Sequence, residues 1–135
     1  MEQLDLTSLE HAVATFDEII ERYSVEFNDT AIRDALIQRF EYTYSLSVKM
    51  LMRYLKIILP EQEDISTFNE TIRNSNRAGL LLSNLEKWSV YRQNRNLSSH
   101  TYNEKIANDV ANIAKDFQDE VHYLLEKLKA NNAKR

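Results

Sequence analysis

The sequence contains no cysteine, and only one glycine and one proline among its 135 residues. The absence of cysteine excludes disulfides, thiolate zinc sites and cysteine nucleophiles, and it fits a cytoplasmic protein. A β-sandwich or an α/β fold needs many turns, and turns depend on glycine and proline. We therefore expect an all-α fold in which long helices are joined by polar connections, and a chain of this length is one domain, residues 1–135.

Long apolar runs are also missing, since none approaches the ~20 residues that a bilayer-spanning helix requires. The chain starts M-E-Q-L-D, which lacks the apolar stretch of a signal peptide. Apolar residues make up 43% of the chain and charged residues 28%, a composition that is neither disordered nor membrane-spanning. We expect a cytoplasmic protein with no membrane partner.

Positive charge is scarce overall, and the net charge of −4 argues against a generic nucleic-acid coat protein. Residues 72–105 nevertheless hold six Lys or Arg against two Asp or Glu, which gives this segment +4 and leaves −8 for the rest. The first 30 residues carry eight acids against one arginine. An anionic ligand is therefore expected to meet segment 72–105.

Apolar residues recur at helical spacing in five segments. Thr7 with Glu10, and Thr101 with Glu104, have the spacing of capping boxes. The third helix is expected to begin near 66–67 and to include the apolar run 78–82, where Gly79 either breaks it or lets another backbone approach. The expected helices cover residues 8–27, 31–59, 66–82, 84–97 and 103–130.

The second expected helix carries two neighbouring apolar stripes, more than one helical neighbour can cover. Either this helix lies centrally in a bundle, or one face meets a second copy of the protein. Long helices with short connections predict an up-and-down antiparallel four-helix bundle with an additional short helix.

Segment 88–102, W-S-V-Y-R-Q-N-R-N-L-S-S-H-T-Y, concentrates the groups that carry chemistry. The planar guanidinium of Arg95 fits phosphate oxygens, and the imidazole of His100 titrates near pH ~6.5. Together they could cleave RNA without a metal or other cofactor: His100 as acid and base, and Arg95 holding the scissile phosphate. An R-x4-H spacing also arises by chance, and Trp88, Tyr91 and Tyr102 are expected to serve core or interface packing rather than base stacking.

The five-residue spacing raises a geometric problem. On a straight helix five residues turn about 500°, so the side chains of Arg95 and His100 point about 140° apart. They converge only if the helix ends or bends between them, or if a dimer brings two copies together. Ser98, Ser99 and Thr101 favour a helix end at this point.

Residues 95–102, R-N-L-S-S-H-T-Y, resemble the R-x4-6-H motif of HEPN domains, in the branch of nucleotidyltransferase substrate-binding proteins. Segment 33–42, R-D-A-L-I-Q-R-F-E-Y, followed by Lys49 and residues 53–55, is similar to the second helix of that branch. Ile72-Arg73, residues 78–80 and Trp88 are similar to its third and fourth helices. The resemblance spans about residues 5–128.

The resemblance implies a homodimeric helical bundle in which the motifs of two protomers meet at one cleft. It also implies a partner, a minimal nucleotidyltransferase, in a pair that resembles a toxin–antitoxin system. In such pairs the partner can adenylylate the tyrosine of the motif, here Tyr102, and a bulky anion there would block the cleft and repel RNA. The chain has no nucleotidyltransferase active site of its own.

Three functions are consistent with these residues. The first is a metal-independent endoribonuclease toxin neutralised by the partner, with Arg95, His100 and Asn96 as catalytic residues. Its substrate contacts would come from Arg92, Tyr91 and Ser99. The second is a non-catalytic subunit that binds a nucleotide or other substrate for a two-chain nucleotidyltransferase, which the acidic net charge favours. The third is a scaffold in which Arg95 and His100 only bind acidic groups of a partner.

Overall fold

The computed structural model describes residues 3–61 and 67–134, and within them it contains five α-helices, one 3₁₀ turn and no strand. The all-helical prediction is therefore confirmed for these residues. None of their helices combines the length and hydropathy needed to cross a bilayer. The elements are α1 (Thr7–Val25), α2 (Thr30–Ile58), α3 (Phe68–Arg77), α4 (Leu85–Leu97), η1 (Ser98–His100) and α5 (Glu104–Ala133).

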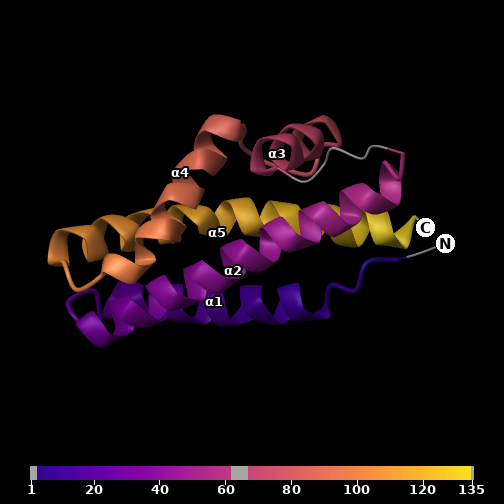
Figure 1. Cartoon of the computed structure of the whole chain (residues 1–135). Helices are drawn as coiled ribbons and strands as arrows, with labels where there is room; N and C mark the ends of the chain where they lie inside the picture. The colour runs from indigo at the N-terminus through magenta and orange to yellow at the C-terminus, as the bar shows by residue number, and fades with distance from the viewer. Residues whose placement is uncertain (1–2, 62–66, 135) are drawn as a thin grey trace.

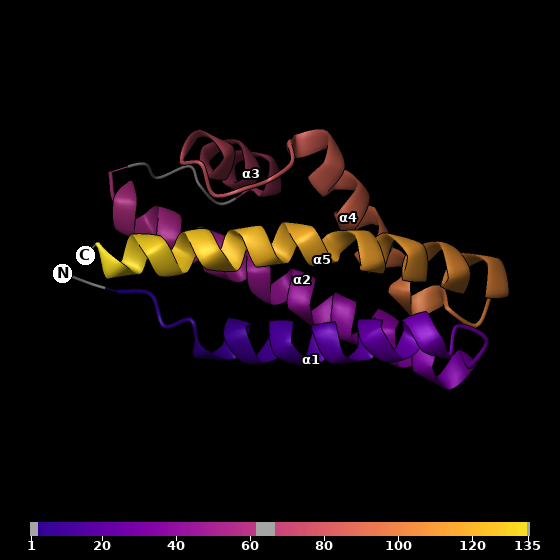
Figure 2. The same ribbon diagram turned by 180° about the vertical axis from the view of Figure 1, so that it is seen from behind.

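Helices α1, α2 and α5 run side by side, and α3 and α4 lie on one side of them (Figures 1 and 2). Helix α2 contacts every other α-helix, so the expectation of a central second helix is confirmed. Met50 and Tyr54 of its second apolar stripe are buried accordingly, whereas Tyr42 stays 42% exposed. The two chain ends lie close together at one end of the molecule (Figure 1).

An aromatic cluster around Phe117 of α5 joins four of the helices. The Phe117 ring lies 6.3 Å from Phe16 of α1 and 5.5 Å from Phe40 of α2, measured between ring centroids. Trp88 and Tyr91 of α4 approach the same ring edge-on, at 5.6 Å and 4.9 Å. Edge-to-face packing adds to the hydrophobic burial of such large rings. This cluster therefore holds α4 against α5 in one rotational setting.

The start of α1 differs from the prediction. Thr7 is the first helical residue, and Leu6 at the N-cap position makes no side-chain capping bond. Asp5 instead accepts a hydrogen bond from the Thr7 N–H at 3.0 Å, which lowers the pKa of the Asp5 carboxyl. The predicted capping box of Thr7 and Glu10 is therefore wrong, because the chain turns earlier than this pairing requires.

The starts of α2 and α5 are capped by Asp29 and Asn103. Asp29 accepts from two backbone N–H groups of the first turn, which confirms the predicted break before α2. At α5 the Asn103 side chain accepts from the Ile106 N–H at 3.2 Å, so the predicted box of Thr101 and Glu104 is wrong. The Glu104 carboxylate binds an arginine instead, as described below.

Gly79 ends α3 rather than lying within it. Its φ is +74°, and its N–H donates to Asn76 O while the Leu80 N–H donates to Ser75 O, both at 3.0 Å. These are the two hydrogen bonds of a Schellman motif. Of the two roles expected for Gly79, the helix break is confirmed, and the expected extent of this helix to residue 82 is wrong, since the left-handed residue stops α3 after Arg77.

Replacing Gly79 with alanine is expected to lower the free energy of unfolding by about 1 kcal/mol. The cost comes from the left-handed backbone, because a Cβ at this position would meet nothing within 4 Å. Gly79→Asn serves as the matched control and should lose less, since asparagine tolerates this conformation better. Urea unfolding followed by circular dichroism measures both, and an alanine variant as stable as the wild type would contradict the assignment.

Candidate functional site

The motif segment lies where one helix ends and the next begins. Helix α4 ends at Leu97, η1 covers Ser98–His100 and α5 begins at Glu104. The predicted helix end between Arg95 and His100 is therefore confirmed. The Ser98 hydroxyl lies between the carboxylate of Glu41 on α2 and the carbonyl oxygen of Arg95, and it can donate to either. This contact ties the break to α2.

Arg95 lies against α2, half-buried, and its Nε donates to Ser45 Oγ at 3.2 Å. The side chain lines two neighbouring hollows of about 400 and 430 Å³. Within residues 3–61 and 67–134, no carboxylate forms an ion pair with Arg95. Its positive charge is therefore available to an anion that enters either hollow.

His100 and Tyr102 lie on the exposed side of the break. Tyr102 is 83% exposed, and its hydroxyl lies 3.4 Å from His100 Nδ1, with the two rings steeply tilted at 68°. Of the two expected roles for Tyr102, core or interface packing, the exposure of its ring excludes packing in the core of its own chain. His100 lines neither hollow that Arg95 lines. A single chain thus holds the guanidinium in the hollows and the imidazole outside them.

Helix α4 has buried residues on one side and residues that line the 400 Å³ hollow on the adjoining side. Trp88 is fully buried and Tyr91 is 2% exposed, as expected for core residues. Burial also raises the pKa of the Tyr91 hydroxyl. The prediction that Tyr91 contacts substrate is not supported, because a ligand cannot reach a ring packed against Phe117.

Of the other predicted residues, Arg92 and Asn96 line the 400 Å³ hollow together with Arg95. The Arg92 guanidinium lies 4.7 Å from the centroid of the Phe68 ring. Ser99 is exposed on η1 and lines neither hollow. The structure thus brings Arg92, Arg95 and Asn96 together, and it leaves His100, Ser99 and Tyr102 on the neighbouring turn and loop.

A buried arginine fixes the start of α5 beside this site. The Arg33 side chain is only 6% exposed, and it donates to Glu104 at 2.7 Å and to its neighbour Asp34 at 3.2 Å. The hydrogen bond with Glu104 raises the pKa of Arg33, and the same bond lowers the pKa of the Glu104 carboxyl. This pair connects the first turns of α2 and α5, and so anchors the loop that carries Tyr102.

Sequence reasoning missed several of these contacts. Ser45 contacts Arg95, Phe68 contacts Arg92 and Glu41 accepts a hydrogen bond from Ser98, but the spacing of these three residues carries no chemical pattern. Arg33 and Glu41 do fall within the segment that resembles the second helix of the related branch, which is the signal that could have identified them. In the described parts of the chain, no group of three His, Asp or Glu side chains could hold a metal ion.

Comparison with known proteins gives concordant results. A family model described as nucleotidyltransferase substrate binding protein like matches residues 4–130. A Haemophilus influenzae protein named probable ribonuclease HepT is 35% identical over 131 residues, which cover 93% of this chain and 87% of that relative.

Two solved structures resemble this one closely. HI0074 from Haemophilus influenzae, described as having the fold of a substrate binding domain of a nucleotidyltransferase, superposes with a TM-score of 0.86 at 30% identity. That match covers 93% of this chain and 99% of HI0074. A protein from Thermus thermophilus gives a TM-score of 0.71 at 31% identity, over 89% of this chain and 98% of that one.

Replacing Glu104 with glutamine is expected to destabilise the protein at pH 7, because the buried Arg33 loses the closer of its two charged partners and keeps only Asp34. The pKa of Glu104 is lowered in the folded state, so its contribution is present above the pKa of the unfolded state and disappears as the pH falls through the folded-state value. The stability difference between wild type and Glu104→Gln should therefore shrink between pH 7 and pH 3.

Urea unfolding at the two pH values measures this difference. Glu18→Gln is the matched control, because Glu18 is an exposed glutamate of α1 without an ion pair among the described residues. A stability difference for Glu104→Gln that stays constant or grows on acidification would contradict the assignment.

Proposed function

The chain belongs to the nucleotidyltransferase substrate-binding protein family, and we propose that it is a homodimeric, metal-independent endoribonuclease controlled by a partner nucleotidyltransferase. The observation that carries this proposal is Arg95, which lines two hollows and has no ion-pair partner among the described residues, followed after a helix break by the exposed imidazole of His100. The similarity to a protein named probable ribonuclease HepT supports the same interpretation.

The proposed reaction is transesterification of an RNA phosphodiester. An imidazole of His100 removes the proton of the 2′ hydroxyl, and the 2′ oxygen forms a bond to the adjacent phosphorus. The bond from phosphorus to the 5′ oxygen of the next nucleotide breaks, and that oxygen receives a proton. Arg95 stabilises the negative charge that builds up on the phosphate oxygens, and Asn96 orients the group.

A second protomer is part of this proposal for a geometric reason. One chain holds Arg95 in the hollows and His100 outside them, so the complete site takes side chains from two chains. The exposed Tyr42 and the neighbouring Leu46 border the 430 Å³ hollow that Arg95 lines, and they give a second copy an apolar surface beside the motif. Two imidazoles at one cleft would let one remove a proton while the other supplies one.

Control by the partner is proposed to act on Tyr102. Its side chain is 83% exposed and its hydroxyl lies 3.4 Å from the His100 ring. Transfer of an adenylyl group from ATP would form a bond from this oxygen to the α-phosphorus, release pyrophosphate and the phenolic proton, and place a bulky anion directly beside the imidazole. It would exclude RNA both sterically and by charge repulsion.

A second candidate function is a non-catalytic subunit that presents a substrate to the nucleotidyltransferase. The name of the family and the description of HI0074 favour it, and so does the net charge of −4. In that case the hollows beside Arg95 would bind a nucleotide or another anionic substrate without cleaving it.

Purified, unmodified protein is expected to cleave RNA in the presence of EDTA. His100→Asn should reduce the rate at least about 100-fold, which is the usual contribution of a general acid or base. His11→Asn is the matched control, because His11 is an exposed histidine on α1, remote in sequence from the motif. Gel analysis of labelled RNA measures all three, and equal cleavage by wild type and His100→Asn would remove His100 from the mechanism. No cleavage by the wild type would favour the substrate-binding subunit.

Coexpression with the partner nucleotidyltransferase is expected to add the mass of one nucleotidyl group to this chain. Tyr102→Phe should abolish the adduct, whereas Tyr42→Phe should retain it, since Tyr42 is also exposed but belongs to α2 rather than to the motif loop. Intact-protein mass spectrometry followed by peptide mapping measures the modification. An adduct that persists in Tyr102→Phe would contradict the proposed control.

A further inference from the structure

Two adjoining hollows lie where α3 and α4 meet α2, and of the proposed reacting pair only Arg95 lines either of them. One of about 670 Å³ is lined by residues that include Phe68, Asn69, Arg73 and Arg92, and the other is the 400 Å³ hollow that Arg95 lines. Phe68 and Arg92 line both. The two hollows therefore form one continuous depression, here called the α3–α4 trough, which ends at the arginine of the motif.

The trough is positively charged in a protein that is acidic overall. Arg92 and Arg95 are three residues apart on α4, so they lie on neighbouring turns of the same face. In the described parts of the chain neither has a carboxylate within ion-pair distance, whereas Arg22, Arg33 and Lys87 do. Two unneutralised guanidinium groups beside one hollow are a site for an anion.

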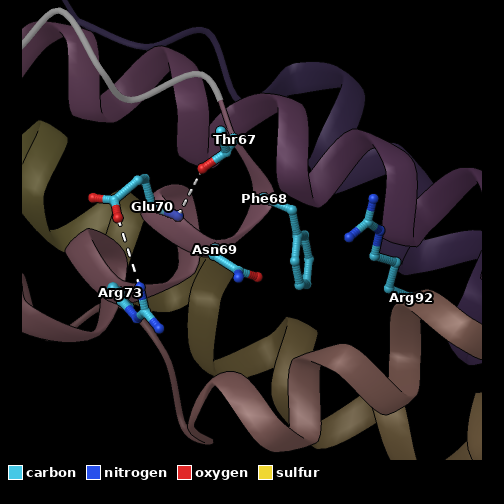
Figure 3. A pocket seen from close by; sticks show the side chains of 6 residues that line it. All are labelled: Thr67, Phe68, Asn69, Glu70, Arg73 and Arg92. Carbon is cyan, nitrogen blue, oxygen red and sulfur yellow. Dashed lines mark hydrogen bonds and ion pairs between the residues drawn. The ribbon is translucent and has the colours of Figure 1, made fainter.

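Arg73 adds a third positive charge at the far end of the trough. Figure 3 shows Phe68 and Asn69 between Arg73 and Arg92. Among the described residues that line the trough, the single carboxylate is Glu70, which lies 3.7 Å from Arg73. Both side chains of this pair are about half-exposed, and such surface ion pairs are weak. A phosphate can therefore compete with Glu70 for Arg73.

Phe68 supplies an aromatic surface among these cations. Its ring is partly buried against the core, and the Arg92 guanidinium lies 4.7 Å from its centroid. This cation–π contact holds the guanidinium inside the trough and reduces the entropy that it would lose on binding a ligand. Aromatic rings and guanidinium planes are the surfaces on which unpaired bases stack, and amides such as Asn69 and Asn96 can hydrogen-bond to bases and sugars.

We propose that the α3–α4 trough binds the phosphates and a base of a nucleotide chain, namely the unpaired RNA nucleotides that flank the scissile phosphate. The Phe68 ring lies between the guanidinium groups of Arg73 and Arg92, an order that matches a base between two phosphates of a single strand. The trough ends at Arg95, so RNA held there continues into the reacting phosphate. The choice of RNA as the ligand rests on the proposed function, whereas the capacity of the trough to bind an anion rests only on the residues that line it.

The same chemistry is present in a free nucleotide, which the substrate-binding alternative would place in the trough. The test therefore compares two ligands, a labelled single-stranded RNA oligonucleotide and ATP. Binding is measured in the His100→Asn background so that the RNA stays intact, by fluorescence anisotropy over a series of salt concentrations. Thermal unfolding confirms that each variant is folded.

Arg92→Gln and Arg73→Gln are each expected to weaken RNA binding about tenfold, since each removes a charged contact to phosphate. Each should also reduce the slope of log affinity against log salt by about 0.7, the value for one phosphate contact on a single strand. Phe68→Leu should weaken binding at least about fivefold but leave the slope unchanged, because it removes stacking and no charge. Arg22→Gln on α1 is the matched control and should bind like the background protein.

If these variants weaken the binding of RNA but not of ATP, the ligand of the trough is a nucleotide strand. If they weaken the binding of ATP but not of RNA, the ligand is a free nucleotide. The inference would be overturned if Arg92→Gln and Arg73→Gln bound both ligands as tightly as the Arg22→Gln control does. It would also be overturned if the background protein bound neither RNA nor ATP. The two proposals fail separately. If binding depends on Arg92 but the protein cleaves no RNA, the binding role of the trough is supported and the ribonuclease proposal is wrong. If cleavage depends on His100 but not on Arg92, the ribonuclease proposal is supported and the binding role of the trough is wrong.

Discussion

Packing around the Phe117 ring is the constraint on which the site depends. Trp88 and Tyr91 meet this ring edge-on and are buried, which sets the rotation of α4 about its axis. Arg95 follows Trp88 by seven residues, two turns of helix, and so lies on nearly the same side, where it reaches Ser45 of α2 instead of bulk solvent. Arg92 lies beside it on the preceding turn. Core packing thus determines which way Arg92 and Arg95, the side chains proposed to bind anions, face in a predominantly acidic protein.

Much of this architecture could be predicted from the sequence, because it follows from local signals. The near absence of glycine and proline predicted the helical class, and the apolar periodicity predicted five helices whose ends lie within a few residues of those observed, apart from the end of α3. The third helix is the informative exception. Its apolar run 78–82 continued the pattern, yet Gly79 adopts a left-handed conformation and stops the helix.

Contacts between distant segments could not be predicted in this way. The pairing of Arg33 with Glu104 joins residues 71 positions apart, and it takes the carboxylate that the predicted capping box required. The placement of Arg92 over Phe68 likewise depends on how α3 docks against α4. Sequence spacing identified Arg95 and His100 as candidates and identified the break between them. It did not reveal that, within one chain, Arg95 lines the two hollows and His100 lines neither.

The proposed function requires Arg95 and His100 to surround one phosphate in an assembly of two chains. A crystal structure of the wild-type protein with an RNA fragment that lacks the 2′ hydroxyl at the scissile position tests it most directly, because such a ligand cannot react. We expect two protomers whose Arg95 and His100 side chains line a single cleft, with the scissile phosphate in contact with both kinds of group. A structure in which these side chains face separate regions of solvent, with the phosphate bound elsewhere, would contradict it.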